Sequence, residues 1–388
     1  MKKEHLRAVF TLVAVVTSFP FISGIAGGIY IWLSPNVMAA SVIALRSAVL
    51  FNLFGIAVAA LCFYRKRLFC NMLCPTGWCC HHFSKMSHRK RPDRIPVHTG
   101  KMIAIFTIAS ALFGYPLLLW IDPIVIFCSF WVVFRFNDLS LTLIMALSAF
   151  PVVLFSQWLF PHSWCGNICP LGGMQDLLWQ LRTFVQRIFE KENIKTAQQY
   201  SITRREILVS LSGFFSGFLL KATKSDRNQT IRPPACLDTP QFETICLRCG
   251  NCVRACPTHI IKWNIHPTNW YAWMTPMIDF TDSYCLSNCT ICGKVCPSGA
   301  ITPFTARAKK ILPIGKALIN VEDCLLQIPD ECGLCKHVCA YEAIKIIARH
   351  STTVLPYVNE ERCVGCGACA QICPERVIRI MNHNNKSK

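Results

Sequence analysis

The chain is 388 residues long, and its 40 Lys and Arg residues outnumber its 21 Asp and Glu residues, which gives a formal net charge of +19. Hydrophobic residues make up 53% of the chain and charged residues only 16%, well below the roughly 25% that is usual in globular proteins. This composition excludes an ordinary soluble domain. The basic residues are sorted by segment and form no single basic patch, so nucleic acid is not an expected partner.

Uncharged stretches in the first half of the chain predict four transmembrane helices. We expect them near Arg7 to Ala26, Val42 to Tyr64, Met102 to Ile121 and Leu139 to Phe160, because each stretch can hold the ~20 residues that cross a bilayer. Lys and Arg gather in the N-terminal tail, in the 65–101 loop and after the fourth helix, and the positive-inside rule assigns these segments to the cytoplasm. The sequence therefore predicts a multi-pass protein of the bacterial inner (cytoplasmic) membrane, in contact with lipid.

This half of the chain also contains a repeated cysteine motif. Residues 69–75 read FCNMLCP, and residues 164–170 read WCGNICP, each after a predicted helix that ends on the same side of the membrane. The repeat is expected to bring together Cys70, Cys74, Cys165 and Cys169. Four thiolates from two equivalent helix ends suit an additional iron-sulfur cluster, and two separate structural or redox thiol pairs are the alternative.

A short helix with two leading arginines follows. Arg204 and Arg205 precede the uncharged residues 207–220, which is the form of a twin-arginine export signal, and no small-residue cleavage site follows. We interpret residues 201–225 as an uncleaved, signal-like anchor helix that places the rest of the chain on the periplasmic side. The alternative is a short core helix preceded by two positive-inside charges.

The last part of the chain carries four cysteine groups. They are Cys246, Cys249, Cys252 and Cys256 (motif 1); Cys285, Cys289, Cys292 and Cys296 (motif 2); Cys324, Cys332, Cys335 and Cys339 (motif 3); and Cys363, Cys366, Cys369 and Cys373 (motif 4). Three closely spaced cysteines hold one 4Fe-4S cluster, and the fourth reaches across to a partner cluster. The spacing predicts four 4Fe-4S clusters; zinc sites use cysteine pairs, and a disulfide scaffold needs no Cys-Pro ending.

Two weaker signals lie outside these groups. Residues 79–82 read CCHH and offer four metal ligands, but we interpret them as polar residues of an interfacial loop. Asp122, Arg135, Asp138 and His162 are ionisable groups near a candidate quinol site, and loop solvation explains them equally well.

On these motifs, the chain resembles a fusion of two known families. Residues 1–200 are similar to the membrane protein NapH, which is related to NosR and MauN. Residues 201–388, with Arg204-Arg205 and the four motifs, are similar to the exported four-cluster ferredoxin NapG, of the MauM type. The resemblance implies the electron-transfer component of a quinol dehydrogenase, which passes electrons from the quinone pool to a periplasmic cytochrome or reductase. The alternative is a maturation factor of the MauM/MauN type.

The resemblance also implies a domain plan and a cluster pairing. We expect an α-helical membrane domain (1–200), the anchor helix (201–225) and an α+β polyferredoxin domain (226–388) built from two bacterial-type two-cluster units. Motifs 1 and 4 would form one unit, with Cys256 and Cys373 exchanged between their clusters. Motifs 2 and 3 would form the other, with Cys296 and Cys339 exchanged.

Overall fold

The computed structural model describes residues 2–18, 29–46, 52–87, 98–132, 141–189, 203–222, 230–265, 272–327, 332–348 and 354–382. The chain divides into two compact units. The helical unit comprises Met1–Lys224 with the short segments 243–249 and 297–299, and the cysteine-rich unit comprises Ser225–Phe242, Gly250–Cys296 and Ala300–Lys388. The predicted boundary between anchor helix and polyferredoxin domain, at residues 225 and 226, lies outside the described residues.

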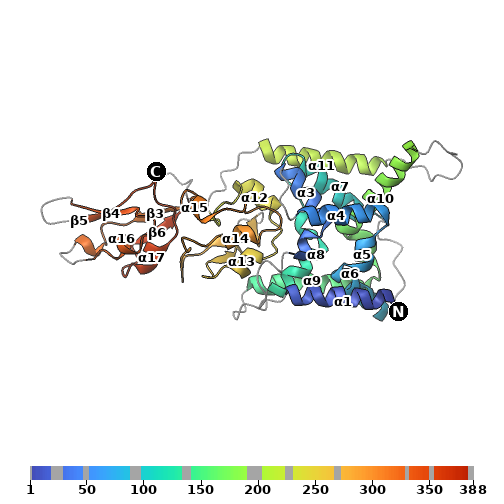
Figure 1. Ribbon diagram of the computed structural model, residues 1–388, viewed down its shortest axis with the longest axis horizontal. Helices are drawn as coiled ribbons and strands as arrows, with labels where there is room; N and C mark the ends of the chain where they lie inside the picture. The colour runs from blue at the N-terminus through green and yellow to red at the C-terminus, as the bar shows by residue number, and fades with distance from the viewer. Residues whose placement is uncertain are drawn as a thin grey trace. The chain divides into compact units, whose positions relative to one another are not determined.

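Helices of 5 to 20 residues build the helical unit (Figure 1). They are α1 (Lys2–Ser18), α3 (Pro35–Leu45), α4 (Asn52–Tyr64), α5 (Leu68–Met72), α6 (Pro75–Met86), α7 (Thr99–Ala111), α8 (Pro123–Val132), α9 (Leu141–Leu159), α10 (Pro170–Phe189) and α11 (Arg204–Ala222), with a 3-10 turn η1 (Leu119–Ile121) and a π-helical turn η3 (Trp164–Ile168). Proline stands at the first position of α3, α6, α8 and α10, where its missing N–H costs no hydrogen bond.

The predicted transmembrane helices are wrong. Among the described residues, no helix combines the length and the apolar character that crossing a bilayer requires. The apolar stretches are interrupted by turns: α3 ends at Leu45, before Arg46, whose backbone is left-handed (φ 51°), and α7 ends at Ala111, before a second left-handed residue at Leu118 (φ 64°). The predicted α-helical membrane domain, the membrane-spanning anchor and the multi-pass inner-membrane location all depended on these helices, and they are corrected with them.

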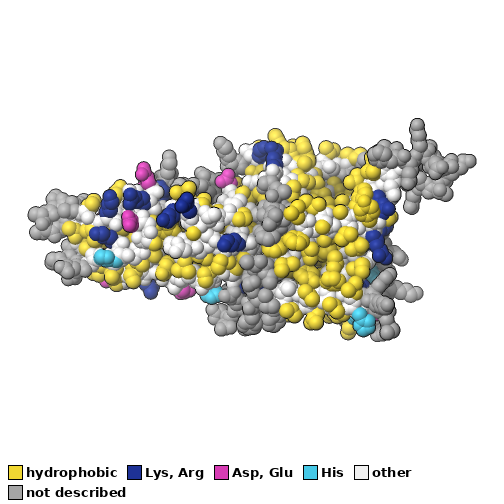
Figure 2. Space-filling model, viewed as in Figure 1, with side chains coloured by type: hydrophobic (Ala, Val, Ile, Leu, Met, Phe, Trp, Pro, Cys, Tyr) yellow, Lys and Arg dark blue, Asp and Glu magenta, His cyan; other side chains and the backbone are white. Residues whose placement is uncertain are grey.

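The helical unit nevertheless exposes large hydrophobic side chains. Members of this set come from α1, α4, α9 and α11, and Figure 2 shows hydrophobic side chains gathered over this unit. Examples are Leu12 (63% exposed), Leu53 (57%), Val152 (62%), Leu208 (65%) and Phe215 (60%). These helices therefore turn apolar side chains outward as well as into the core, which gives the unit an apolar outer surface.

Close backbone contact fixes α11 against α7. A Cβ atom added at Gly213 would lie 2.7 Å from the carbonyl oxygen of Phe106, and one at Gly217 would lie 2.8 Å from that of Ser110. At the start of α11, Glu206 is buried and forms an ion pair with the buried Lys101 of α7. The arginine-led helix thus belongs to the packed helical unit.

Asp122 was expected in a solvated loop, but it is fully buried. Its carboxylate accepts hydrogen bonds from Ser34 Oγ (2.9 Å), from Asn36 Nδ2 (3.4 Å) and from the backbone N–H of Ile124 at the start of α8 (3.0 Å). Burial raises its pKa to about 6, against the opposing effect of these hydrogen bonds. Asp122 therefore caps α8 and ties it to the segment that enters α3.

The cysteine-rich unit is built of short helices and strands. They are α12 (Thr239–Ile245), which ends in the segment grouped with the helical unit, α13 (Asn251–Ala255), β1 (Ile261–Trp263), β2 (Pro276–Ile278), α14 (Ile291–Lys294), α15 (Ala306–Lys309), β3 (Lys316–Ile319), η5 (Leu325–Gln327), α16 (Leu334–Val338), β4 (Ile344–Ala348), β5 (Val354–Val358), α17 (Ala368–Ile372) and β6 (Ile378–Met381). The strands pair antiparallel as β1–β2, β3–β6 and β4–β5. Cysteines occupy the core itself, since Cys335 and Cys369 are buried in the cluster that contains Ala317, Ile344 and Ile378.

The close approach of α11 and α7 leads to a stability prediction. Gly217→Val should lower the free energy of unfolding by roughly 1–3 kcal/mol, because the new side chain must push the α7 backbone away. Thermal unfolding of the full chain measures the effect. Ser212→Val, on the exposed side of the same helix, is the control and should change little. Equal effects of the two variants would contradict the packing described for α11.

Candidate iron-sulfur sites

The four cysteines of the helical unit come from two equivalent places in the fold. Cys70 lies in α5 and Cys165 in η3, while Cys74 and Cys169 directly precede the prolines that begin α6 and α10. The Sγ of Cys74 accepts a hydrogen bond from the N–H of Gly77 (3.3 Å), and the Sγ of Cys169 accepts one from the N–H of Gly172 (3.5 Å). Two helix N-termini therefore direct N–H groups at thiol sulfurs, where they favour negative charge.

These four thiols share one buried environment. Burial raises the pKa of Cys70 to about 12 and holds that of Cys74 well above its usual value, and neighbouring thiolates raise both further. For Cys74 these neighbours are Cys70, Cys165 and Cys169. Four thiolates this close and this buried would repel one another strongly, so the charged form needs cationic iron beside it. The site therefore fits an iron-sulfur cluster.

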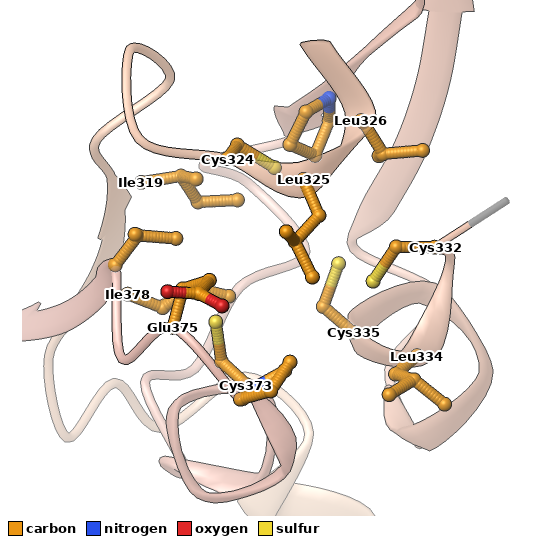
Figure 3. Close-up of a pocket in the computed structure, with 13 residues that line it drawn as sticks. Ile319, Cys324, Leu325, Leu326, Cys332, Leu334, Cys335, Cys373, Glu375 and Ile378 are labelled. Carbon is orange, nitrogen blue, oxygen red and sulfur yellow. The ribbon is translucent and has the colours of Figure 1, made fainter. Parts of the chain in front are cut away.

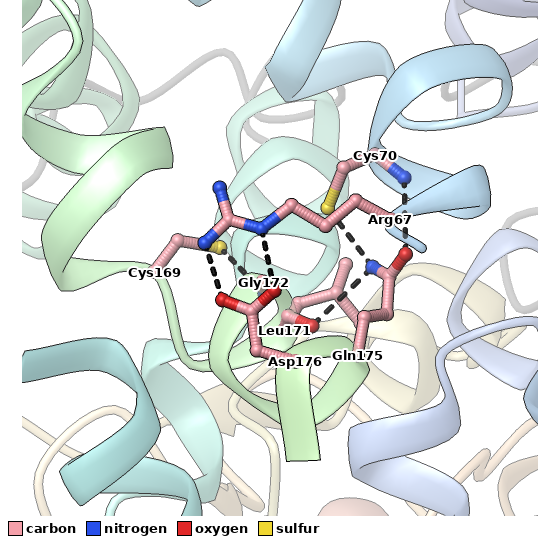
Figure 4. Close-up of polar contacts among 7 residues, drawn as sticks. All are labelled: Arg67, Cys70, Cys169, Leu171, Gly172, Gln175 and Asp176. Carbon is pink, nitrogen blue, oxygen red and sulfur yellow. Dashed lines mark hydrogen bonds and ion pairs between the residues drawn. The ribbon is translucent and has the colours of Figure 1, made fainter. Parts of the chain in front are cut away.

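A polar network surrounds the site (Figure 4). Gln175 is fully buried, donates from Nε2 to the Sγ of Cys70 (2.9 Å) and to the carbonyl oxygen of Leu171 (3.3 Å), and accepts at Oε1 from the backbone N–H of Cys70 (3.5 Å). Arg67 forms a two-pronged ion pair with Asp176, with contacts of 2.9 and 2.5 Å. Its positive charge favours the thiolate forms of Cys70 and Cys165. Hydrogen bonds and charge of this kind around a cluster tune its reduction potential.

Cys80 is a fifth thiol at this site. The CCHH segment, interpreted above as an interfacial loop, lies inside α6. Cys80 is 1% exposed and hydrogen-bonds with Cys165, and this interaction is the largest cause of the raised pKa of Cys165. His82 is exposed and stacks on Trp78, with ring centroids 4.2 Å apart. Of the two histidines and two cysteines, Cys80 makes direct contact with a motif cysteine.

In the cysteine-rich unit, cavities bring together three closely spaced cysteines and one from another motif. The first is lined by Cys285, Cys289 and Cys292 of motif 2 with Cys256 of motif 1. The second is lined by Cys363, Cys366 and Cys369 of motif 4 with Cys339 of motif 3. The third is lined by Cys324, Cys332 and Cys335 of motif 3 with Cys373 of motif 4, whose sulfur atoms surround one space in Figure 3. We call these the motif-2, motif-4 and motif-3 cavities.

The pairing implied by the resemblance is therefore wrong. Cys256 completes the motif-2 set and not the motif-4 set, and Cys339 and Cys373 are exchanged between motifs 3 and 4. Motifs 3 and 4 thus form one two-cluster unit, and motif 1 pairs with motif 2. The physical reason is that the crossing cysteine directly follows a short helix and reaches the neighbouring cavity: Cys256 follows α13, Cys339 follows α16 and Cys373 follows α17.

The motif-2 and motif-4 cavities also contact each other. The backbone N–H of Cys285 donates to the carbonyl oxygen of Cys366 (2.9 Å). The Tyr341 hydroxyl, which lines the motif-4 cavity, is close enough to Cys285 and Cys366 for their thiolates to raise its pKa, although burial is the larger cause. The three cavities therefore stand in series, with the motif-4 cavity between the motif-2 and motif-3 cavities.

The cysteine environments fit 4Fe-4S clusters as the bound groups. Burial raises the pKa of Cys292 and of Cys369 to about 12, so these thiols carry charge only beside a cation. The N–H of Ala343 donates to the Sγ of Cys339 (3.3 Å) and that of Ile301 to the Sγ of Cys296 (3.4 Å), as expected for cluster thiolates. Within the described residues, no three His, Cys, Asp or Glu side chains gather closely enough to hold a single metal ion.

Three protein-family models match four segments of the chain. A 4Fe-4S dicluster domain matches residues 245–300, which contain motifs 1 and 2 together. A 4Fe-4S binding domain matches residues 356–379, which contain motif 4, and another 4Fe-4S binding domain matches residues 48–92 and 142–192, which contain the four cysteines of the helical unit. The prediction of multiple 4Fe-4S clusters is confirmed.

Relatives among known proteins are ferredoxin-type proteins. The methylamine utilization ferredoxin-type protein MauM of Methylophilus methylotrophus is 31% identical over 179 residues, which cover 43% of this chain and 77% of the relative. The ferredoxin-type protein NapF of Escherichia coli (strain K12) is 32% identical over 174 residues, 45% of this chain and 94% of the relative. The chain belongs to the family of ferredoxin-type proteins. NapG of the same strain is 32% identical over 158 residues, 37% of this chain and 65% of the relative. No solved structure matches.

The chain is therefore an iron-sulfur electron carrier, and the likeness of its first half to NapH stays a prediction.

Sequence reasoning missed several polar side chains at the sites. Gln175 and Asp176 follow Cys169 by one to two helical turns, a spacing that marks the same region of α10 and could have signalled them. Lys309, which lines the motif-2 cavity, gives no such signal, because it stands in a basic run that looks solvent-exposed.

The cluster pairing leads to a test by double substitution. Cys256→Ser combined with Cys292→Ser should lose the iron of one cluster, because both cysteines line the motif-2 cavity. Cys256→Ser combined with Cys369→Ser should lose the iron of two clusters. Iron and sulfide analysis of anaerobically purified protein measures both. The reverse pattern would restore the pairing of motif 1 with motif 4.

Proposed function

We propose that the protein is an electron conduit that accepts electrons from a quinol and delivers them to a partner oxidoreductase. The observation that carries this proposal is the series of motif-2, motif-4 and motif-3 cavities, joined by the hydrogen bond between Cys285 and Cys366. A bound 4Fe-4S cluster takes up and releases single electrons. A catalytic site for chemistry on a substrate would need one cavity with convergent polar groups, whereas a series of cysteine-lined cavities suits transfer over distance.

The sixteen motif cysteines and four cysteines of the helical unit are the proposed ligands. Crossing cysteines hold neighbouring clusters together, since Cys339 and Cys373 each belong to one motif and line the cavity of the other. By the same rule, Cys296 completes the set of Cys246, Cys249 and Cys252, which remains when the other three cavities are assigned. Each exchange keeps two clusters at a fixed short separation, which electron transfer requires.

The helical unit is the proposed entry point for electrons. Quinol is apolar, and this unit offers apolar outer faces together with the buried set of Cys70, Cys74, Cys165 and Cys169. Oxidation of one quinol releases two electrons and two protons, so the electrons leave singly through clusters while the protons pass to water. The cysteine-rich unit is the proposed exit toward the acceptor. A periplasmic acceptor is the expectation that follows from Arg204-Arg205.

A second candidate function is electron delivery during maturation of another redox enzyme. The similarity to the methylamine utilization protein MauM, which covers 77% of that relative, is the observation that favours this second function. The two functions differ in their partner. A conduit forms a complex with the mature oxidoreductase, whereas a maturation factor binds only the precursor that lacks its finished cofactor. Affinity capture with mature and precursor forms of a candidate partner separates the two.

The first prediction of this proposal concerns quinol. Mixing anaerobically purified protein with a menaquinol analogue should partly bleach the visible iron-sulfur absorbance within the time of a stopped-flow measurement, and dithionite should complete the bleaching. Cys70→Ser should slow or abolish bleaching by quinol, because it removes a ligand at the proposed entry point, and should leave most of the bleaching by dithionite.

Cys128→Ser is the matched control. Cys128 is buried in α8 of the same unit and belongs to neither cysteine motif, so this variant should react with quinol like the native protein. Bleaching by dithionite alone in the native protein would reject quinol as the donor. Equal quinol reactivity of the Cys70→Ser and native proteins would reject the helical unit as the entry point.

A further inference from the structure

Lys309 is a buried cation at the motif-2 cavity. It is the last residue of α15 and is 1% exposed. Its Nζ donates to the Sγ of Cys285 (3.2 Å) and to the carbonyl oxygens of Leu286 (2.5 Å) and Cys289 (2.7 Å). The ammonium group has three N–H donors, and these contacts use all three, on one ligand sulfur and on two backbone carbonyl oxygens of the motif-2 segment. Lysines are almost never fully buried unless they are paired, so a thiolate partner accounts for this placement.

The charge of Lys309 acts on more than one ligand. Burial raises the pKa of Cys285 and of Cys292, and the positive charge of Lys309 opposes this rise at both. A side chain that favours negative sulfur also favours the reduced cluster, because reduction adds negative charge to the same group. A hydrogen bond to a ligand sulfur acts in the same direction.

The other cavities have different electrostatic linings. Among the residues that line the motif-4 cavity, Tyr341 is the polar side chain besides the cysteines, and no lining residue is charged. The motif-3 cavity has Glu375 in its lining, and Figure 3 shows its carboxylate beside Cys373. A carboxylate opposes added negative charge on the cluster, although water screens this exposed one in part.

We propose that Lys309 gives the motif-2 cluster the highest reduction potential of these three and that Glu375 gives the motif-3 cluster the lowest. The inference rests on the proposed conduit and deepens it by naming the cluster on which electrons collect. Because the motif-4 cavity stands between the other two, potentials rise in spatial order from motif 3 through motif 4 to motif 2. Electrons that reach this series therefore gather beside Lys309, at the cluster that shares Cys256 with motif 1.

The test is a potentiometric titration of the full chain followed by electron paramagnetic resonance. Lys309→Met should lower the potential of one reduction step, that of the motif-2 cluster, by at least the equivalent of a tenfold change in its reduction equilibrium, about 59 mV for one electron. Lys309→Gln keeps a hydrogen-bond donor without the charge and should lower the same step by a smaller amount. Lys310→Met, at the exposed neighbouring position, should move no step.

Glu375→Gln provides an independent arm, because it leaves the motif-2 cavity unchanged and should raise a different step, that of the motif-3 cluster. Iron and sulfide content, measured on every variant, confirms that the compared samples hold the same clusters. The proposal is overturned if no step falls in either Lys309 variant, if a step falls as far in Lys310→Met, or if the step that falls lies below the step that Glu375→Gln raises. Failure of quinol to reduce the native protein would reject the donor and would leave this ranking intact, so the two proposals fail separately.

Discussion

Both units bury cysteine thiols, and the charged form of a buried thiol is stable only beside a cation. The rest of the structure depends on this constraint. In the cysteine-rich unit, the helices run from four to seven residues and the sheets have two strands each, so little conventional core is available. Cysteines fill that role, with Cys335 and Cys369 packed against Ala317, Ile344 and Ile378. Thiols with a pKa raised to about 12, as at Cys292, become ligands when iron offsets the cost of their charge. Cluster binding and folding are therefore coupled.

The helical unit meets the same constraint with a different architecture. A repeated turn places a cysteine before Pro75 and another before Pro170, and the N–H of the glycine three residues after each cysteine donates to its sulfur. Two helix N-termini thus supply electrostatic support that the cysteine-rich unit draws from loop N–H groups and from Lys309. Gln175 and the Arg67–Asp176 pair then complete the surroundings of this site.

Local spacing made part of this arrangement predictable. Three closely spaced cysteines wrap one cluster, and in motifs 2, 3 and 4 the predicted set of three lines a single cavity. The partner of the fourth cysteine depends on how motifs pack in three dimensions, and the pairing inferred by resemblance was wrong for Cys256 and Cys373. The convergence of Cys70, Cys74, Cys165 and Cys169 followed from the repeat, because equivalent turns occupy equivalent places in the fold.

Helix lengths were less predictable, since apolar composition does not reveal a turn. Arg46 and Leu118 adopt left-handed backbone conformations that interrupt the apolar stretches, and Gly114 and Pro116 before Leu118 are turn residues that apolar composition does not count. Asp122 was expected in a solvated loop, but Ser34 and Asn36 donate hydrogen bonds to its carboxylate in the interior. Lys309 could not be predicted as a site residue, because a basic run normally faces water. Only its tertiary contact with Cys285 distinguishes it from Lys310.

Native mass spectrometry of the anaerobically purified full chain tests the central claim most directly. The measured mass should equal that of the polypeptide plus five 4Fe-4S clusters, with one cluster lost in Cys74→Ser and none in Cys236→Ser, a substitution outside the motifs. Bound zinc, or a mass lowered by disulfide formation among the motif cysteines, would contradict the claim.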